Sequence, residues 1–427
     1  MSLPAEINYT QKLTALPAGT SLMSIVTAPS NGSVFQDGGI LYMDLISRGS
    51  MIPSSLYIRY KLTVTTDATA NPYIRGIPAY SVFARSECLI GSSIIETIQG
   101  YNQVSSMVVN TKMNTAQKVG LSASLGLLDQ STTPTFDNVD GYKLLPSATN
   151  VLSLSAPLGN MFSACQQPLP LGKMPACRIQ LTLDALTNLV SVGGTSFSVS
   201  NVELCYDVVD FGAEIDAAVD SMVNESGEIV IKSQGFMNSA QIVPIGLQGS
   251  TELVYGLRLA SIKSLFALFC GTNAAYNPSA WASSRDITSN SGDLAFTISG
   301  KSYPDRPVST TLNKAAFLSE LSAAWGPSHD ILTSNFAITQ KQFYGYLGSG
   351  VVADPVSHPS RFIFSVNCEK LATNGALLTG VSSSNTPITL RINSSVATAQ
   401  TFNVNVIALF DALIKVNPLT RQASVMI

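Results

Sequence analysis

"CRIQLTL", residues 177–183, and "TPITLRI", residues 386–392, are the pair of stretches that decides the fold. The apolar positions of the first recur 209 positions later in the second, Ile179, Leu181 and Leu183 becoming Ile388, Leu390 and Ile392. Alternation of apolar and polar residues is typical of a half-buried β-strand. One strand pattern repeated about half a chain apart indicates two related halves.

Other matches keep nearly the same shift and the same order. "SSLYIRY" at Ser54 matches "KSLFALF" at Lys263, and "GSSIIE" at Gly91 matches "GKSYPD" at Gly300, each 209 residues apart. Further on, "FSV" at Phe197 matches "FNV" at Phe402, and "CYDVV" at Cys205 matches "LFDAL" at Leu409, at shifts of 205 and 204. These matches predict a structural duplication, with the first copy ending near Phe211 and the second starting near Gly227.

The composition favours a subunit of an assembly. The chain has 427 residues, enough for two domains, but only 12% are charged, about half the usual share. Such a protein hides much of its surface in a membrane or against other chains. The best apolar run, residues 264–271, is too short to span a membrane, and the first residues do not resemble a signal peptide. Burial against other chains is the better explanation.

The charge pattern and the cysteines exclude several other classes. The net charge of −3 is spread without blocks, and the only basic residue among the first 30 is Lys12, so we expect no direct tight binding of nucleic acid. The six cysteines have no Cys-x-x-Cys spacing and several lie in apolar runs, which predicts buried reduced thiols and no zinc site.

The remaining pattern is mostly β. Alternating segments such as 56–65, 197–204 and 402–409 are separated by runs of Ser, Thr, Gly, Asn and Pro. Helical spacing occurs in residues 213–226 and 310–326, and Gly326 followed by Pro327 can end the second helix. Many strands with two helices favour β-sandwiches over a doubly wound sheet.

Three segments carry a resemblance to a known family: "CLIGSSIIETIQGYNQV" (88–104), "SYPDRPVSTTLNKAAFLSEL" (302–321) and "FSVNCEKLATNGALLTGVSSSNTPITLRI" (364–392). With the duplication and the low charge, they resemble the double jelly-roll major capsid proteins of eukaryotic double-stranded DNA viruses, the lineage of polinton-like viruses, virophages and adenovirus hexon. The resemblance covers nearly the whole chain by pattern rather than by sharp motif. The chain lacks room for the long tower loops of the largest members, which puts surface decoration in doubt.

The resemblance implies an all-β chain of two tandem eight-stranded jelly-roll sandwiches, with a short connecting helix and one helix in the second domain. The expected division is an N-terminal arm (1–22), a first jelly roll (23–212), a connector helix (213–226), a second jelly roll (227–416) and a C-terminal tail (417–427). The arm and the tail are candidates for joining capsomers.

The same resemblance implies a homotrimer that forms pseudo-hexagonal capsomers of an icosahedral virion shell. Neighbouring capsomers, penton proteins and minor capsid proteins are the expected partners. Contact with an inner membrane stays open, and no cofactor is expected. The alternatives are a two-domain β-sandwich protein that binds or acts on carbohydrate, and a minor capsid or penton-type protein.

No catalytic, cofactor-binding or metal residue is predicted. The two histidines, His329 beside Asp330 and His358 near Asp354, fall in loops rich in Pro and Ser, and the chain has no G-x-S-x-G elbow. "AFTISGKS" (295–302) has nearly P-loop spacing, but its interior is strand-like and two prolines follow it. The glycine-containing stretch 368–392 is interpreted as a connection between strands.

The acidic and aromatic clusters are interpreted as structural features rather than as binding sites. The acids around the connector, Glu214, Asp216, Asp220, Glu225 and Glu228, favour a solvated helix face, with a cation between subunits at Asp216 and Asp220 as the alternative. Trp281, Trp325 and the cluster Phe343, Tyr344 and Tyr346 are expected in the core or at a subunit contact. Four glycosylation sequons, at Asn8, Asn31, Asn224 and Asn393, are expected to be unused.

Overall fold

The chain is described here from a computed structural model. It describes residues 20–69, 72–113, 115–127, 141–212, 217, 220–221, 227–271, 278, 281, 287, 292–310, 314–326, 338, 343, 361–370, 378–395, 397–398, 401–417, 420 and 422–427. Among these residues, no helix is both long enough and apolar enough to cross a membrane.

The first half of the chain folds into two antiparallel sheets. One sheet has the order β1 (Ser21–Thr27), β12 (Gly194–Asp210), β5 (Tyr57–Thr66) and β10 (Thr149–Pro157), with the short β2 (Val34–Phe35) and β4 (Ser50–Met51) also paired to β12. The other sheet has the order β3 (Ile40–Asp44), β11 (Cys177–Leu183), β7 (Phe83–Ile90) and β8 (Ser93–Gln99). A small additional sheet pairs β6 (Tyr73–Arg75) with β9 (Gly141–Lys143).

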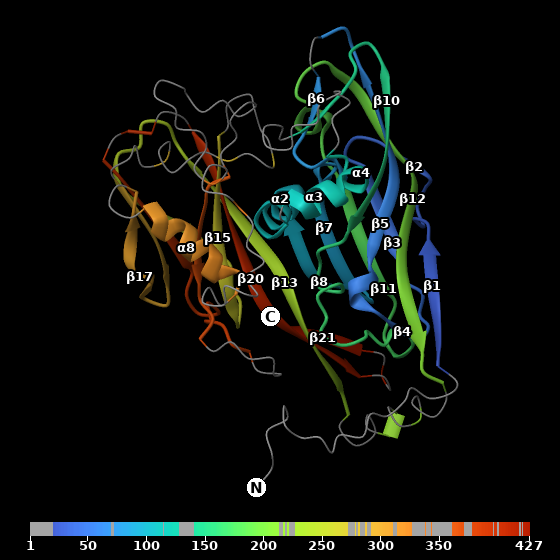
Figure 1. The fold of residues 1–427 in the computed structure, drawn as a ribbon. Helices are drawn as coiled ribbons and strands as arrows, with labels where there is room; N and C mark the ends of the chain where they lie inside the picture. The colour runs from blue at the N-terminus through green and yellow to red at the C-terminus, as the bar shows by residue number, and fades with distance from the viewer. Residues whose placement is uncertain are drawn as a thin grey trace.

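The second half repeats this arrangement. Its first sheet has the order β13 (Ile229–Val243), β20 (Phe402–Asn417), β15 (Ile262–Gly271) and β18 (Ile363–Asn367), with β21 (Gln422–Met426) also paired to β20. Its second sheet has the order β14 (Gly249–Tyr255), β19 (Ile388–Ser394), β16 (Gly292–Ile298) and β17 (Lys301–Ser309). Figure 1 shows the first half, blue to green, beside the second, yellow to red.

Both halves have jelly-roll connectivity. Counting the eight main strands of each half in chain order, one sheet joins the first, eighth, third and sixth, and the other joins the second, seventh, fourth and fifth. The order is the same in the two halves. The two halves are therefore tandem jelly rolls, as the sequence predicts, and are called the first roll and the second roll below.

Each sequence match falls on strands that hold the same place in the two rolls. The match at Ser54 and Lys263 leads into β5 and β15, the third strands, and the match from Phe197 onward joins β12 to β20, the eighth strands. Strands β11 and β19 also share one burial pattern, with every second residue buried. Gly91 and Gly300 lie in the two equivalent hairpin turns, with φ of 60° and 77°, where a residue with a Cβ is disfavoured.

The helices were only partly predicted. The helix expected at 310–326 is present as α8 (Lys314–Ala324), whereas most of the expected connector helix 213–226 lies outside the described residues. The structure adds α2 (Tyr101–Lys112), α3 (Thr115–Gly120) and the one-turn helices α1 (Pro78–Ser81), α4 (Ser122–Leu125) and α5 (Leu186–Leu189). Helix α2 was missed because it is buried on nearly every side and rich in Ser, Asn, Thr and Val, so it has no amphipathic stripe.

The two ends of the chain differ from a simple arm and tail. Strand β1 begins at Ser21, inside the expected arm 1–22, and residues 1–19 lie outside the described residues. In the expected tail 417–427, residues 422–426 form β21 and pair with Leu413–Asn417 of β20. The sequence "QASVM" is a short strand with alternating exposure, and it adds to the sheet that contains β20. The exact domain boundaries stay predictions.

Aromatic rings fill the core of the second roll. Phe296 of β16 stacks on Phe364 of β18 with ring centroids 5.1 Å apart, and Phe317 of α8 meets Phe364 edge-on at 5.9 Å. All three side chains are fully buried. Helix α8 therefore contributes to the core of the sandwich and holds β16 and β18 together through one cluster.

We expect Phe296→Ala to lower the free energy of unfolding by about 3–5 kcal/mol, because it removes a buried ring and leaves a cavity between the sheets. Phe296→Leu, the matched control, keeps most of the volume and should cost clearly less. Urea unfolding at one fixed chain concentration measures both. Equal and small losses for the two variants would contradict a supporting role of this cluster.

Candidate assembly interface

The two rolls meet where β8 of the first lies beside β13 of the second (Figure 1). The contact depends on Glu96 of β8, whose carboxylate accepts hydrogen bonds from both rolls. The backbone N–H of Phe236 on β13 donates to Oε1 at 3.0 Å, and the N–H of Met161 in the first roll donates to Oε2 at 2.6 Å. One side chain of β8 therefore binds a loop of the first roll and strand β13 of the second.

Burial changes the acidity of Glu96. The residue is 2% exposed, and burial raises its pKa from 4.5 to about 7, while the two backbone N–H donors and the Cys88 thiol oppose the shift. Burial also raises the pKa of Cys88 well above its ordinary value, with the Glu96 charge adding to the effect. Glu96 is therefore protonated more readily than an exposed glutamate, and the Cys88 thiol stays neutral at ordinary pH.

Gly235 allows β13 to approach Glu96. A Cβ at this position would lie 2.8 Å from Oε1 of Glu96, 2.8 Å from the Phe410 ring and 3.2 Å from the Met161 side chain. All of these distances are too short for ordinary packing. Gly235 was not among the residues predicted to be important from the sequence. A lone glycine inside a long strand, "IKSQGFMN", is the available signal for close approach of two backbones.

A polar network extends the contact beyond Glu96. Asn238 of β13 accepts the N–H of Gln99 at 2.9 Å, and its own amide donates to the Gln99 carbonyl and to Asn405 of β20. Asn405 in turn donates to Gln103 of α2 at 2.7 Å. Gln103 also donates to the Cys270 sulfur at 3.4 Å. These bonds link α2 to the second roll.

The end of α8 forms a third part of the junction. Trp325 packs on Phe266 of β15 at 4.6 Å, and Lys112 at the end of α2 lies 4.7 Å from the centroid of the Trp325 ring. Burial lowers the pKa of Lys112, and the neighbouring Lys263 adds to this. Lys263 pairs with Glu369 at 3.2 Å. The two rolls thus share polar, aromatic and ionic contacts and form one block.

The first roll presents apolar residues to solvent along β1. Leu22 is 63% exposed and Val26 is 51% exposed. Val26 lies opposite Cys205 of β12, which lies opposite Tyr57 of β5, and Tyr57 is also exposed. Exposed apolar residues that adjoin one another indicate a contact surface rather than scattered surface residues.

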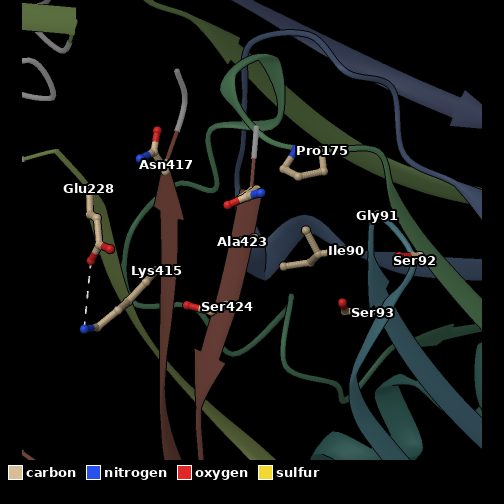
Figure 2. A pocket seen from close by; sticks show the side chains of 11 residues that line it. Ile90, Gly91, Ser92, Ser93, Pro175, Glu228, Lys415, Asn417, Ala423 and Ser424 are labelled. Atoms are coloured by element: carbon tan, nitrogen blue, oxygen red, sulfur yellow. Dashed lines mark ion pairs between the residues drawn. The ribbon is translucent and has the colours of Figure 1, made fainter. Parts of the chain in front are cut away.

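A cavity of about 370 Å³ lies below the junction (Figure 2). The β7–β8 hairpin lines one side with Ile90 and Ser93, and β20 and β21 line the other with Lys415 and Ser424. Lys415 faces Glu228 at 3.9 Å. The lining is polar and contains neither a histidine nor a cysteine.

The residues singled out from the sequence do not form a chemical site in the part of the chain that is described. His329, His358, Asp330, Asp354, Tyr344, Tyr346, Glu214, Asp216 and Glu225 lie outside it. Asp220 pairs with Lys173, and no group of three or more metal-binding side chains occurs among the described residues. The P-loop-like stretch 295–302 is the β16–β17 hairpin, so it offers no helix N-terminus to a phosphate.

The aromatic residues and the cysteines have structural positions. Trp281 and Phe343 are buried in the core, and Trp325 is half-buried at the junction between the rolls. All six cysteines, Cys88, Cys165, Cys177, Cys205, Cys270 and Cys368, are buried free thiols. The stretch 368–392 leads into β19, and its described residues contain no helix.

Solved viral capsid structures share this fold. The Faustovirus major capsid protein is similar with a TM-score of 0.62 and 10% identity, over 95% of this chain and 92% of that chain. The PBCV-1 virus capsid gives 0.59 and 11%, over 98% and 99%. The mavirus major capsid protein gives 0.54 and 9%, over 100% and 95%. No family model and no curated protein sequence matches the chain. The chain therefore has the double jelly-roll fold of these structures.

We expect the stability of the protein to depend on pH through Glu96. Because its pKa is raised in the folded state, ionisation of Glu96 opposes folding, and stability falls as pH rises from about 4.5 to about 7. Between pH 5 and pH 8 the wild type should lose about 2–3 kcal/mol that Glu96→Gln does not lose, since glutamine stays neutral.

Urea unfolding at the two pH values measures this difference. Glu96→Gln should also be less stable than the wild type at pH 5, because its amide nitrogen cannot accept the second backbone N–H. Glu252→Gln, on strand β14, is a control that leaves the junction intact. Parallel pH dependence in the wild type and Glu96→Gln would contradict the role assigned to this carboxyl group.

Proposed function

We propose that the chain is the major capsid protein of a double-stranded DNA virus and acts by self-assembly in the virion shell. The observation that carries this proposal is the double jelly-roll fold, which the chain shares over nearly its full length with capsid proteins of Faustovirus and mavirus. The carbohydrate-binding alternative has no comparable support, because the junction cavity contains no aromatic side chain on which a sugar ring would stack.

The proposed building block is a homotrimer. Two rolls of the same topology in each chain give six similar units around a three-fold axis, and such a block tiles a hexagonal lattice. The low charge supports extensive contacts between subunits, since obligate interfaces are large and apolar, often above about 2,000 Å² in total. Neighbouring capsomers, penton proteins and minor capsid proteins are the proposed partners.

The proposed role requires no catalysis. Glu96 and Cys88, which are buried, and Lys112, which is exposed, all lie in contacts between elements of the fold. Their shifted pKa values follow from burial at a junction between two rolls, which is a structural cause. We therefore propose a protein without enzymatic activity, with no bound cofactor.

We expect the purified protein to have a mass near three times the 45.1 kDa of one chain, stable on dilution. Light scattering after size exclusion measures it. A pentamer would favour a penton-type protein instead. A monomer that stays monomeric at high protein concentration would contradict a capsomer and would return attention to the carbohydrate-binding alternative.

A further inference from the structure

Strand β21, the last strand of the second roll, has a free edge that opens into a cavity. It pairs with Leu413–Asn417 of β20, and among the described residues it has no second partner strand. Ala423 and Ser424 point to opposite faces of β21, yet both line the cavity of about 370 Å³ below the junction. The cavity therefore reaches the edge of the strand. Figure 2 shows β21 on one side of it and the β7–β8 hairpin on the other.

The edge of β21 lacks the usual protection against the addition of a strand. Its sequence, "QASVM", contains neither a proline nor a charged residue, whereas β17 carries both. Folded proteins normally protect such an edge with charges or proline, or cover it with another segment. We therefore expect a further stretch of chain to cover β21.

The wall of the cavity suits the main chain of an extended peptide. Hydroxyl and amide side chains dominate the lining: Ser92, Ser93, Asn417, Gln422 and Ser424. These groups both donate and accept hydrogen bonds, as a peptide main chain does. The volume lies within the range of about 300–1,000 Å³ that is typical of binding pockets.

Exposed apolar side chains border this polar wall. Ile94, the residue after Ser93, is 56% exposed, and Val230, which lies opposite Lys415, is 46% exposed. Met426 continues the face of β21 that carries Ser424 and is 45% exposed. In strand addition the main chain of the incoming peptide forms hydrogen bonds while alternate side chains enter apolar sites. The cavity and its border offer both.

The sequence before β1 has the pattern of such a strand. Residues 6–13 read "EINYTQKL" and contain neither proline nor glycine. The apolar residues Ile7, Tyr9 and Leu13 are an even number of positions apart, so in an extended segment they fall on one face. The intervening residues are all polar. One face of the segment therefore suits the apolar border, and its main chain suits the edge of β21.

Strand β1 begins at the end of the first roll where the cavity lies. Val209 of β12 pairs with both Leu22 of β1 and Ser50 of β4. The residue before Ser50 accepts a hydrogen bond of 3.0 Å from the backbone N–H of Gly172, and Pro175, three residues farther on, lines the cavity. Residues 1–19 extend over about 60 Å when fully stretched. They are therefore long enough to reach this cavity from Leu22.

We propose that residues 6–13 dock in the cavity of their own chain, as a strand added to the free edge of β21. Ile7 and Tyr9 then contact the apolar border, and the main chain bonds to the edge. The covalent link to β1 favours the chain's own segment over that of another copy, because a short linker gives an effective concentration in roughly the millimolar range. The contact needs no second subunit, so it is independent of the proposed capsomer.

Hydrogen exchange of β21 is the first test. Deletion of residues 2–14 leaves β1 intact and should speed exchange of the amides in residues 422–426 by about tenfold or more, because their edge loses its cover. Ile7→Asp with Tyr9→Asp should have the same effect in the full chain. A synthetic peptide of residues 1–15, added to the deletion variant, should restore slow exchange.

The matched control is Ala15→Asp with Ala18→Asp. It adds the same two charges outside the docked segment and should exchange at the wild-type rate. Exchange in β10 should be equal in all variants, which shows that the fold is intact. Equal exchange of β21 in the wild type and the deletion variant would overturn the proposal, whether β21 is protected in both or in neither.

A disulfide scan is the second test and identifies the copy that supplies the strand. Single cysteines at positions 6–13 are combined with Ser424→Cys, and the native thiols give no background because they are buried. Mild oxidation should link positions two residues apart and leave those between them free, since neighbouring residues of a strand face opposite ways. The same scan with Ser153→Cys, which is exposed on β10 and does not line the cavity, should give no linked product.

The linked product should run as a single chain on a denaturing, non-reducing gel. A product of two chains would assign the strand to another copy and overturn the docking within one chain. No linkage at any position would overturn the docking itself. Neither result changes the mass of the wild-type protein in light scattering, so the proposed capsomer is tested separately.

Discussion

The close approach of β13 to β8 is the constraint on which the arrangement of the two rolls depends. Gly235 removes the one Cβ that would strike Glu96, and Glu96 fills the resulting space with a carboxylate that binds a backbone N–H of each roll. A buried carboxylate is costly unless its oxygens are satisfied. The second roll supplies one of the two backbone donors, so both oxygens are satisfied by the protein only when the two rolls are in contact.

This dependence favours one block over two domains that move independently. Contacts between domains are usually modest and polar, so relative motion is the normal expectation. Here the contact contains a carboxyl group with a pKa near 7, a linked set of amide side chains and a tryptophan with a lysine over its face. The proposed shell subunit would need such a fixed contact, because errors of angle within one subunit accumulate around a ring.

Much of the fold could be predicted from the sequence, and the reason is periodicity. Strands β11 and β19 are half-buried, so their alternation is visible, and the repeat between them survives where few letters match. The helix α8 was visible because Leu318 and Leu321 lie at helical spacing in a segment ended by Gly326. The local sequence pattern is enough to predict an element that has one solvent-exposed face and one buried face.

The features at the junction could not be predicted in this way. Glu96 stands in "SIIETIQ" as an ordinary polar strand residue, yet in the fold it is buried and binds the backbone of the second roll. Helix α2 lies against both rolls and so lacks a polar face. Strand β21 was interpreted as a tail from the sequence. It pairs with the last residues of β20, on the side where β15, among the described residues, pairs only as far as Phe410. For Glu96 and α2 the deciding contact joins segments far apart in the chain, whereas β21 pairs with β20, the strand directly before it.

The junction also limits how the subunits can associate. The rolls meet through side chains, and no ladder of main-chain bonds joins β8 to β13 in the described residues. Strand β17 carries Pro304, Pro307 and exposed charges, which are the usual protection of an edge against strand addition. A neighbouring chain is therefore kept from adding a strand at this edge. Strand addition from chain to chain would extend a sheet without limit. The side-chain contact between β8 and β13 has instead a fixed geometry, and fixed geometry is what a closed ring of identical subunits, as proposed, would require.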